Sequence, residues 1–320
     1  KEVLVSIMNN YLSQDQLLFT EGNYNNEIGL PLTLLNLKDT HSHAVLELGM
    51  NHAGEIAELA NIAKPNIALI TNIGEAHIQN FSSKDNIAEA KKELLNNSDQ
   101  LETCILPRDD DYYQFLAKDV KSIKLITFGF TNEATINCKV LDEKKITIST
   151  PNENFDVKIN LLGKSNIKNI LAACACSYAL EIPVSIMKKG IEAIKPFPGR
   201  LENIISSNGI TVINDSYNAN PGSYQQAIAT LQAFPGQHWL VLGDFGELGA
   251  DSEHIHTGLG AKAKSAGIER LLTVGTQSQL ANAAFGEGAQ HFADIASLRQ
   301  HLESALAEVI PYSSASIIVF

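Results

Sequence analysis

The sequence lacks any apolar run long enough to cross a bilayer. A membrane helix needs roughly 20 consecutive apolar residues, and no run among these 320 residues approaches that length. Basic charge is also short, because 24 Lys and Arg stand against 36 Asp and Glu, for a formal net charge of −12. Such a balance repels a phosphodiester backbone. We therefore expect no membrane span and no nucleic acid partner, although local fields still permit a small anionic ligand.

Cysteine is scarce as well, and its spacing argues against a zinc site. The chain has four cysteines, and the intervals between them do not match structural zinc ligands. Cys174 and Cys176 lie in an Ala-rich run with a helical pattern. We therefore expect the thiols to pack in cores in a reducing compartment, which favours a cytoplasmic protein. The four positions are Cys104, Cys138, Cys174 and Cys176.

Two nucleotide-binding motifs are missing too. No segment fits the Walker A pattern G-x-x-x-x-G-K-[ST]. The segment 243–249 is rich in glycine, but its glycines do not have the first, third and sixth spacing of the dinucleotide fingerprint. A nicotinamide-binding role is therefore disfavoured, and the Gly-rich loop alone identifies no ligand.

Strand-length apolar runs alternate with helical patterns along the chain. The runs are continuously apolar, which is typical of parallel strands covered on both faces. This alternation predicts an α/β fold with mostly parallel sheets. The predicted strands are 44–48, 67–73, 103–106, 125–128, 210–213, 239–242, 271–274 and 316–320. The predicted helices are 56–63, 86–96, 167–180, 224–234 and 258–266.

Chain length and local breaks predict two domains. A chain of 320 residues is too long for one ordinary core. The segment 195–199, Lys-Pro-Phe-Pro-Gly, cannot continue a helix and precedes a new strand-helix series. We therefore expect domains at 1–199 and 200–320, the first with a small antiparallel hairpin formed by 146–149 and 155–162. The helical pattern of 1–8 without a capping residue, and the strand pattern at 316–320, lead us to expect a chain truncated at both ends.

Polar side chains follow several of the predicted strands. In an open parallel sheet, ligands bind beyond the carboxyl ends of the strands, where loops and helix amino termini converge. Reactive groups gathered at that edge therefore predict an active site more strongly than any one of them alone. These groups are Glu47, Thr71, Asn72, His77, Asn214, Asp215, Asn218 and Asp244.

Glu47 is a candidate metal ligand. It lies among apolar neighbours, where an ionised carboxylate needs a cation or hydrogen-bond donors. Coordination of magnesium is one interpretation, and capping of the helix that begins near His52 is the other. His77 alone is weak evidence, since magnesium prefers oxygen ligands and a lone histidine is commonly an ordinary loop or core residue.

Lys91 is more informative. On a helical wheel it lies near the middle of the apolar face of helix 86–96, whereas Lys92 lies at the edge of that face. The lysine stem could extend until its amine reaches solvent, or the amine could be paired or covalently altered and serve the site.

The segment 215–223 reads as a strand end, a polar turn and a helix start. Asn220 or Ser223 can cap the helix and Pro221 suits its first turn. Capping does not account for Asp215. From the residues alone, the chain is a two-domain α/β protein, with the pattern of an enzyme that handles an anionic ligand with a metal.

Several segments, taken together and in order, resemble the Mur ligases over essentially the whole chain. The turn Tyr217-Asn218-Ala219-Asn220 and the string 243–249 are similar to the branch that adds D-alanyl-D-alanine to a UDP-N-acetylmuramoyl-tripeptide, whereas sister ligases typically carry a histidine in the former segment. The segments are 22–31, 47–50, 71–77, 198–202, 215–221 and 243–249.

This resemblance implies an ATP- and Mg²⁺-dependent amide ligase of peptidoglycan synthesis, acting through an acyl phosphate. It implies a central ATPase-type domain followed by a Rossmann-like domain, in a protein that is a monomer. It also implies a phosphate loop directly before Lys1 and an amino-terminal UDP-sugar domain, so the chain as given is expected to be inactive. The rival hypotheses are another Mur or folylpolyglutamate-type ligase and a non-catalytic nucleotide-binding or dehydrogenase-like protein.

The resemblance also implies a role for each site residue. Glu47 and His77 would hold magnesium, and Lys91 would be the carbamylated lysine of the family. The remaining roles are ATP binding for Asn166, Asn169, Arg200, Asp215 and Asn218, and substrate binding for Asn23, Asn25, Asn26, Asp244, Glu247 and His256. Ser165 departs from the histidine that usually precedes Asn166, which puts the adenine contact in doubt.

Overall fold

The computed structural model describes residues 1–74, 78–118, 120, 123–206, 209–218, 220–309 and 315–320. It divides the chain into two compact units. Unit 1 contains Lys1–Gly74, Asn80–Asn160 and Ser165–Lys195, and unit 2 contains Glu75–Gln79, Leu161–Lys164 and Pro196–Phe320. Each unit has its own sheet and its own core, so each is described by itself.

Unit 1 is built on a six-stranded sheet in the order β3-β4-β5-β6-β7-β8. The pairs from β3 to β6 are parallel, and β6-β7 and β7-β8 are antiparallel. A separate parallel pair, β1-β2, completes the strands of this unit. The strands are β1 (Leu17–Phe19), β2 (His43–Val45), β3 (Ile67–Leu69), β4 (Thr103–Pro107), β5 (Lys124–Gly129), β6 (Ile136–Asp142), β7 (Lys145–Ser149) and β8 (Asn154–Lys158).

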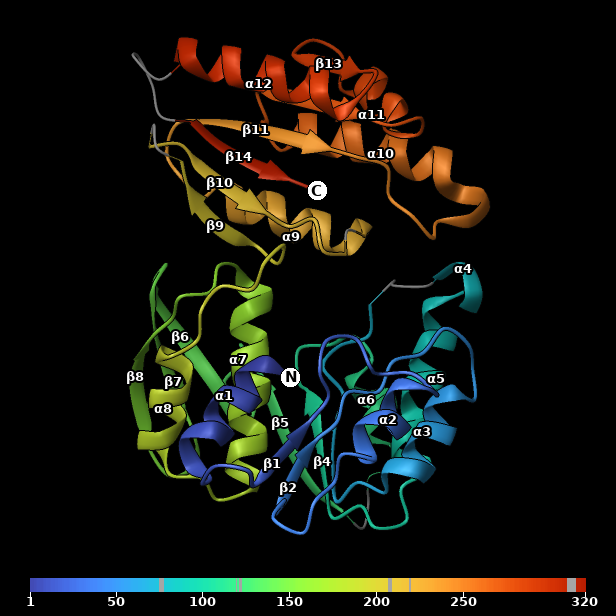
Figure 1. Cartoon of the computed structure of the whole chain (residues 1–320), viewed down its shortest axis with the longest axis vertical. Helices are drawn as coiled ribbons and strands as arrows, with labels where there is room; N and C mark the ends of the chain where they lie inside the picture. The colour runs from blue at the N-terminus through green and yellow to red at the C-terminus, as the bar shows by residue number, and fades with distance from the viewer. Residues whose placement is uncertain (75–77, 119, 121–122, 207–208, 219, 310–314) are drawn as a thin grey trace. The chain divides into compact units, whose positions relative to one another are not determined.

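The helices of unit 1 form two groups. In Figure 1, α1, α7 and α8 lie together beside β6–β8, and α2, α3 and α5 lie together on the other side of β4 and β5. Close packing of α1 on α8 is possible because Gly190 has no side chain where it meets Ile7, which is fully buried. The helices are α1 (Glu2–Tyr11), α2 (Gly29–Leu34), α3 (Glu55–Ala63), α5 (Lys84–Asn96), α6 (Tyr113–Ala117), α7 (Lys164–Ala179) and α8 (Val184–Glu192), with one short turn, α4 (Ile78–Phe81), before α5.

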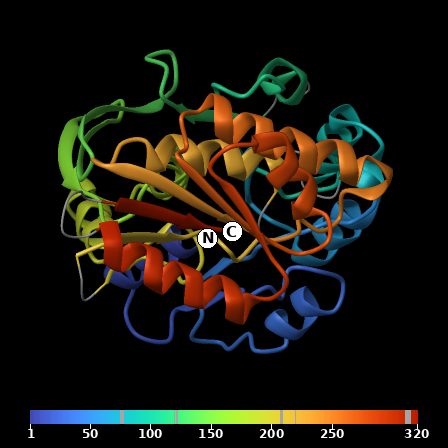
Figure 2. The same cartoon turned by 90° about the horizontal axis from the view of Figure 1, so that it is seen from above.

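Unit 2 is a sheet in the order β13-β12-β11-β14-β10-β9, parallel except for the edge strand β9. Seen from above, α12 covers one face and α9, α10 and α11 cover the other (Figure 2). The strands are β9 (Glu202–Ile205), β10 (Thr211–Asn214), β11 (Gln237–Leu242), β12 (Arg270–Val274), β13 (Ala289–Phe292) and β14 (Ala315–Val319). The helices are α9 (Pro221–Leu231), η1 (Gly249–Asp251), α10 (Ser252–Ser265), α11 (Ser278–Phe285) and α12 (Ile295–Val309).

The central strands of unit 2 are apolar on both faces. Along β11, Trp239 and Val241 pack in the core under α12, whereas Leu240 and Leu242 pack in the core under α9 and α10. Side chains alternate between the faces of a strand, so a continuously apolar run buries both faces. The prediction of an α/β fold with mostly parallel sheets and a small antiparallel hairpin is confirmed.

The helix predicted to start after the polar turn does so as expected. Asn220 is the N-cap of α9, and its side chain accepts from the backbone of Gly222 and Ser223 in a capping box. Pro221 occupies the first turn. The main part of unit 2 begins at Pro196, close to the predicted boundary at residue 200, which stays a prediction. No helix among the described residues is long and apolar enough to cross a membrane.

Candidate functional site

In unit 1, Glu47 lies just beyond the carboxyl end of β2. Its backbone N–H donates to the hydroxyl of the fully buried Thr20 (2.9 Å). Its carboxylate accepts from the Asn25 side-chain amide (3.1 Å) and lies 3.6 Å from the Lys1 amine. The Glu47 side chain is 42% exposed, so its oxygens are both oriented and accessible.

The alternative role considered for Glu47 was capping of the following helix. In the structure another residue caps that helix. Glu93 of α5 accepts from the backbone N–H groups of Gly54 (2.8 Å) and Ala57 (3.1 Å) at the start of α3. Anionic side chains stabilise helix amino termini in this way. The carboxylate of Glu93 therefore ties the loop after Glu47 to the helix that carries Lys91.

The amine of Lys91 ends on the polar edge of the sheet. Lys91 Nζ donates to the backbone carbonyl of Asn72 (2.7 Å), three residues beyond β3. Burial lowers the pKa of Lys91, and the negative charge of Asp110 partly offsets that decrease. The amine is thus hydrogen-bonded within unit 1, and the role of Lys91 in the site stays a prediction.

The helical wheel predicted that Lys91 is more buried than Lys92, and this prediction is wrong. Lys92 is only 5% exposed and is the more buried of the two. Its amine lies 4.4 Å from the centre of the Phe115 ring of α6, a favourable cation–π contact. The wheel placed Lys92 at the edge of the apolar face because it ignores which element packs on the helix.

Two of three consecutive aspartates after β4 hold neighbouring segments. Asp109 accepts from the backbone of Phe130 and Thr131 beyond β5. Asp110 accepts from Ile73 beyond β3 (2.9 Å) and from Tyr112 (3.0 Å). Because β3, β4 and β5 are parallel neighbours, their carboxyl ends share one edge. These aspartates were not predicted from the sequence, although an Asp-Asp-Asp run one residue beyond an apolar strand is a usable signal.

The other candidates in unit 1 lie in two places. Asn25 contacts Glu47, and Asn26 accepts from the backbone of Ile28 and Gly29, which positions the start of α2. Asn23 is exposed. Asn166 and Asn169 are three residues apart in α7, so they share a helix face.

Only two side chains, Glu47 and His77, were predicted to bind a metal. His77 lies outside the described residues. Among the residues that the structure does describe, no group of three His, Cys, Asp or Glu side chains could hold an ion. All four cysteines are free and buried, and burial raises the pKa of the Cys104 thiol to about 12. The prediction that the cysteines pack in cores is therefore confirmed.

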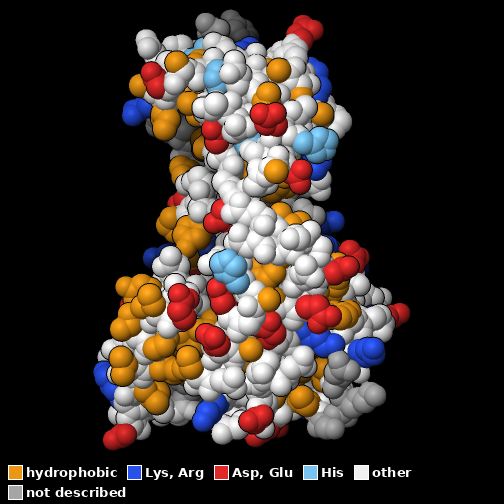
Figure 3. All heavy atoms as spheres, turned by 90° about the vertical axis from the view of Figure 1, so that its right-hand side faces the viewer, with side chains coloured by type: hydrophobic (Ala, Val, Ile, Leu, Met, Phe, Trp, Pro, Cys, Tyr) orange, Lys and Arg blue, Asp and Glu red, His pale blue; other side chains and the backbone are white. Residues whose placement is uncertain are grey.

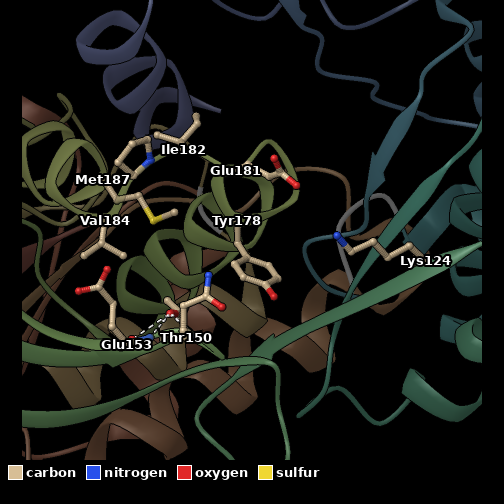
Figure 4. A pocket seen from close by; sticks show the side chains of 10 residues that line it. Lys124, Thr150, Glu153, Tyr178, Glu181, Ile182, Val184 and Met187 are labelled. Carbon is tan, nitrogen blue, oxygen red and sulfur yellow. Dashed lines mark hydrogen bonds between the residues drawn. The ribbon is translucent and has the colours of Figure 1, made fainter.

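A cavity of about 310 Å³ in unit 1 lies away from these groups. Tyr178 and Met187 from α7 and α8, Lys124 at the start of β5 and Glu153 in the β7–β8 turn point toward it (Figure 4). Lys124 begins its strand, whereas the aspartates follow the end of the neighbouring strand. The cavity is therefore at the opposite edge of the sheet from Lys91 and Asp110.

Unit 1 also exposes hydrophobic side chains around α2. Figure 3, which views the side carrying α3 and α5, shows groups of hydrophobic side chains over this unit with acidic side chains between them. Singly exposed apolar side chains are normal, and only a contiguous patch of them marks a contact surface. The exposed hydrophobic side chains near α2 are Tyr24, Ile28, Leu32, Leu35 and Leu37.

In unit 2, Asp215 follows β10 and holds a strained turn. Its carboxylate accepts from the backbone N–H of Leu201 (3.0 Å), which has a left-handed φ of 48°. Burial raises the pKa of Asp215 to about 6, although the adjacent Arg200 opposes that increase. The Arg200 guanidinium lies 4.0 Å from the centre of the Tyr217 ring. Arg200 and Asp215 are therefore brought together, and Asn218 is exposed one residue beyond Tyr217.

Asp244 also forms hydrogen bonds to the backbone of another segment. Its carboxylate accepts from the N–H groups of Thr276 (2.9 Å), Gln277 (3.0 Å) and Ser278 (2.7 Å) at the start of α11. These bonds keep the pKa of Asp244 below its ordinary value although burial acts in the other direction. The carboxylate thus links the end of β11 to the loop after β12.

His256 is fully buried and uses both ring nitrogens within unit 2. Nε2 accepts from the backbone N–H of Phe245 (3.0 Å), and Nδ1 lies 2.8 Å from the carbonyl oxygen of Ser252. Phe245 and Leu248 are buried in the core, whereas Glu247 between them is exposed with a left-handed φ of 58°. The loop is therefore fixed by its buried residues and presents Glu247 outward.

Polar groups from neighbouring parallel strands thus meet at the carboxyl edge of each sheet. This arrangement defines a two-unit α/β protein of the kind that places ligands beyond strand ends. Residues 1–177 match the Mur ligase middle domain, and residues 199–315 match the Mur ligase glutamate ligase domain. The chain belongs to the Mur ligase family.

Individual relatives support this membership. The UDP-N-acetylmuramoyl-tripeptide–D-alanyl-D-alanine ligase of Escherichia coli strain K12 is 38% identical over 296 residues, which are 91% of this chain and 65% of that protein. The ligase of the same name from Bacillus subtilis strain 168 is 37% identical over 265 residues, 80% of this chain and 56% of that protein. The chain thus spans about two thirds or less of the length of these relatives.

Solved structures give the same result. A crystal structure of MurF from Acinetobacter baumannii is 30% identical, covers 100% of this chain and 70% of its own chain, and superposes with a TM-score of 0.90. MurF from Thermotoga maritima in complex with ADP is 24% identical, covers 100% of this chain and 72% of its own, and has a TM-score of 0.84, which shows the shared fold.

Proposed function

We propose that the protein to which this chain belongs is an ATP-dependent ligase that joins D-alanyl-D-alanine to a UDP-N-acetylmuramoyl-tripeptide in peptidoglycan synthesis. The observation that carries this proposal is the shared name of relatives up to 38% identical, whose similarity extends through both units. In this reaction the precursor carboxylate attacks the γ-phosphate of ATP, which forms an acyl phosphate and releases ADP. The dipeptide amine then attacks the acyl carbon, and the amide forms with loss of phosphate and a proton.

The residues of unit 1 fit a magnesium-bound triphosphate. Magnesium is usually held by one or two carboxylates together with waters and substrate phosphates, so a cage of three protein ligands is not required. Glu47 offers an oriented, accessible carboxylate, and the side-chain amide of Asn25 fixes one of its oxygens. We assign Glu47 as a metal ligand on these contacts, and His77, which lies outside the described residues, as its partner on the family resemblance alone. The bound ion would neutralise charge on the phosphates during transfer.

Lys91 fits the family's carbamylated lysine. Burial lowers its pKa, which favours the neutral amine that reacts with carbon dioxide. The resulting carbamate would be an anion at the same edge as the Asn72 carbonyl. For ATP itself we assign Asn166 and Asn169 on α7, and Arg200, Asp215 and Asn218 of unit 2.

The substrate-binding residues divide by the contacts they make. Asn23, Asn25 and Asn26 are assigned to the precursor, and Glu247 to the dipeptide because its side chain is presented outward by its loop. Asp244 and His256 serve the same loop region through backbone contacts. Their expected role in substrate binding stays a prediction, and these contacts support a further role in positioning the loop.

We further propose that the protein is cytoplasmic and monomeric, with one domain boundary between residues 199 and 200. The acidic charge balance and the absence of a membrane-length helix among the described residues are compatible with that location. Light scattering on the full-length protein would test the oligomeric state directly.

Turnover by the full-length protein tests the proposed function. We would incubate it with ATP, Mg²⁺ and UDP-N-acetylmuramoyl-tripeptide, add D-alanyl-D-alanine, L-alanine, D-glutamate or diaminopimelate, and measure phosphate release and product mass. Of these four amine substrates, we expect only D-alanyl-D-alanine to give an amide product. Product with a single amino acid instead would assign a different ligase activity. Calorimetric binding of NAD but not ATP-Mg²⁺ would support the dehydrogenase-like alternative.

A further inference from the structure

A single peptide group beyond β3 is held from both ends by charged side chains. The carbonyl oxygen of Asn72 accepts from Lys91 Nζ (2.7 Å), and the N–H of Ile73 donates to Asp110 Oδ2 (2.9 Å). This carbonyl and this N–H belong to the same peptide plane, because residue 73 follows residue 72. Two side chains from α5 and from the loop after β4 therefore fix one peptide group between them.

The charges match the dipole of that peptide group. A peptide carries a dipole of about 3.5 D with its negative end at the oxygen and its positive end at the N–H. The ammonium of Lys91 lies at the oxygen and the carboxylate of Asp110 lies at the N–H. Each charge is thus at the end of the dipole that stabilises it, and the peptide couples the two groups without a direct ion pair.

Asp110 is itself rigidly placed. Its other oxygen, Oδ1, accepts from the backbone N–H of Tyr112 (3.0 Å), and its own carbonyl accepts from Tyr113 (2.9 Å). Both carboxylate oxygens are therefore used on backbone donors from two segments. Among the described residues, Asp110 is also the carboxylate whose charge raises the pKa of Lys91 against the effect of burial.

We propose that Asp110 is a positioning residue for Lys91. Through the Asn72–Ile73 peptide, its carboxylate fixes where the lysine amine lies and compensates the charge of that amine until the lysine is modified. This role deepens the proposed ligase function and rests on it for its catalytic consequence, but the physical coupling of Asp110 to Lys91 does not depend on the reaction.

A matched control is available at the preceding residue. Asp109 also accepts two backbone N–H groups, from Phe130 and Thr131. In either aspartate, replacement by Asn removes the charge and one of the two acceptors. Asp109→Asn therefore reproduces the structural change of Asp110→Asn at a site that does not hold the Asn72–Ile73 peptide.

The coupling can be measured on the present chain by the chemical reactivity of Lys91. The chain and both variants would be labelled with acetic anhydride at pH 8, and acetylation at Lys91 would be quantified by mass spectrometry against the exposed Lys139. Loss of the Asp110 charge lowers the pKa of Lys91 further and so increases the neutral fraction of the amine. We expect at least about threefold faster labelling of Lys91 in Asp110→Asn and an unchanged rate in Asp109→Asn.

Two results would overturn the proposal. The first is a Lys91 labelling rate in Asp110→Asn that equals the rate in the unaltered chain. The second is an equal increase in the labelling rate in both variants, which would indicate that the carboxyl edge of the unit 1 sheet has loosened as a whole. Circular dichroism confirms that each variant is folded. If Asp110→Asn does not fold, Asp110→Glu provides the second test, because it keeps the charge and should retain the original labelling rate; faster labelling there contradicts charge compensation.

Turnover by the full-length enzyme separates this proposal from the proposed function. Although the neutral fraction of the amine rises, Asp110→Asn removes one of the two side chains that fix the Asn72–Ile73 peptide against which Lys91 is positioned. We therefore expect kcat to fall about tenfold, equivalent to about 1.4 kcal/mol, with the KM for ATP changed less than about twofold. Absence of ligation in the unaltered full-length protein would refute the ligase function and leave the labelling result standing. Increased labelling with unchanged kcat would remove Asp110 from the catalytic account.

Discussion

The two units use polar residues at the carboxyl ends of their strands differently. In unit 1, the Glu47 carboxylate is oriented by a side-chain amide and remains 42% exposed. In unit 2, Asp244 accepts three backbone N–H groups and His256 is fully buried with both nitrogens used. The Glu47 carboxylate is therefore available for chemistry, whereas the side chains of Asp244 and His256 hold loops. Substitution of Lys91 should therefore change turnover, whereas substitution of Asp244 should change the stability of unit 2.

The largest effect is expected for Lys91→Ala in the full-length enzyme. Removing an oriented charged group from a phosphoryl-transfer site commonly costs on the order of a hundredfold or more in kcat. We expect a loss of that size in phosphate release, with partial recovery when short carboxylates such as formate are added. Lys92→Met is the control, since its apolar stem is kept and turnover should remain within about threefold. Unchanged turnover in Lys91→Ala would remove Lys91 from the mechanism.

The second effect concerns stability alone. Asp244→Ala removes an acceptor of three backbone N–H groups and should destabilise unit 2 by about 2 kcal/mol. Trp239 is the single tryptophan and is buried in unit 2, so its fluorescence during urea unfolding reports this unit. Because the folded pKa of Asp244 is lowered, the difference from the unaltered chain should shrink as pH falls through that pKa.

Glu287→Ala is the control for Asp244→Ala. Glu287 is an exposed residue of the same unit, so its removal should change the stability by less than about 0.5 kcal/mol. Equal unfolding midpoints for Asp244→Ala and Glu287→Ala at neutral pH would contradict the account of unit 2.

Asp215→Asn is expected to have a smaller effect and to stabilise unit 2 rather than destabilise it. The folded pKa of Asp215 is raised to about 6, so its contribution to stability is present below the unfolded pKa of about 4 and is lost as pH rises through 6. An asparagine avoids the cost of a buried charge and still offers an oxygen to Leu201. We expect the variant to be about 1 kcal/mol more stable at pH 8, after allowance for solvent screening, and no more stable at pH 4. A destabilised variant at pH 8 would show that the charge itself is needed.

The smallest effect is expected for Asn220→Ala. Loss of the N-cap of α9 should cost about 0.5 to 1 kcal/mol, seen again in Trp239 fluorescence. Asn220→Ser retains a capping oxygen and should recover most of that loss. If both variants match the unaltered chain, the capping box does not contribute to the stability of unit 2.

The fold was predictable because its signals are local. Continuous apolar runs predict strands covered on both faces, and Asn220-Pro221 predicts a helix start from side-chain chemistry within one turn. Strands such as β6 and β9 were not predicted. β6 has an exposed second half, and β9 is an edge strand, so neither forms the continuous apolar run that the prediction required.

The candidate site was only partly predictable. Glu47 and Lys91 stand out in the sequence because each places charge among apolar neighbours. The run 109–111 marks Asp110 as a polar residue near a strand end. The roles of Asp110 and Glu93 do not follow from the sequence, since they depend on which backbone groups of other elements the two carboxylates reach. The burial of His256 is likewise set by packing between α10 and the loop after β11, and its sequence pattern is that of an ordinary polar helix residue.

The most direct measurement is a crystal structure of the full-length protein with a non-hydrolysable ATP analogue and Mg²⁺. The account predicts a Glu47 oxygen within about 2.2 Å of the ion, with the terminal phosphates near the edge where Lys91 and Asp110 hold the Asn72–Ile73 peptide. A nucleotide bound instead in the cavity beside Tyr178 and Met187, with Glu47 free of metal, would contradict it.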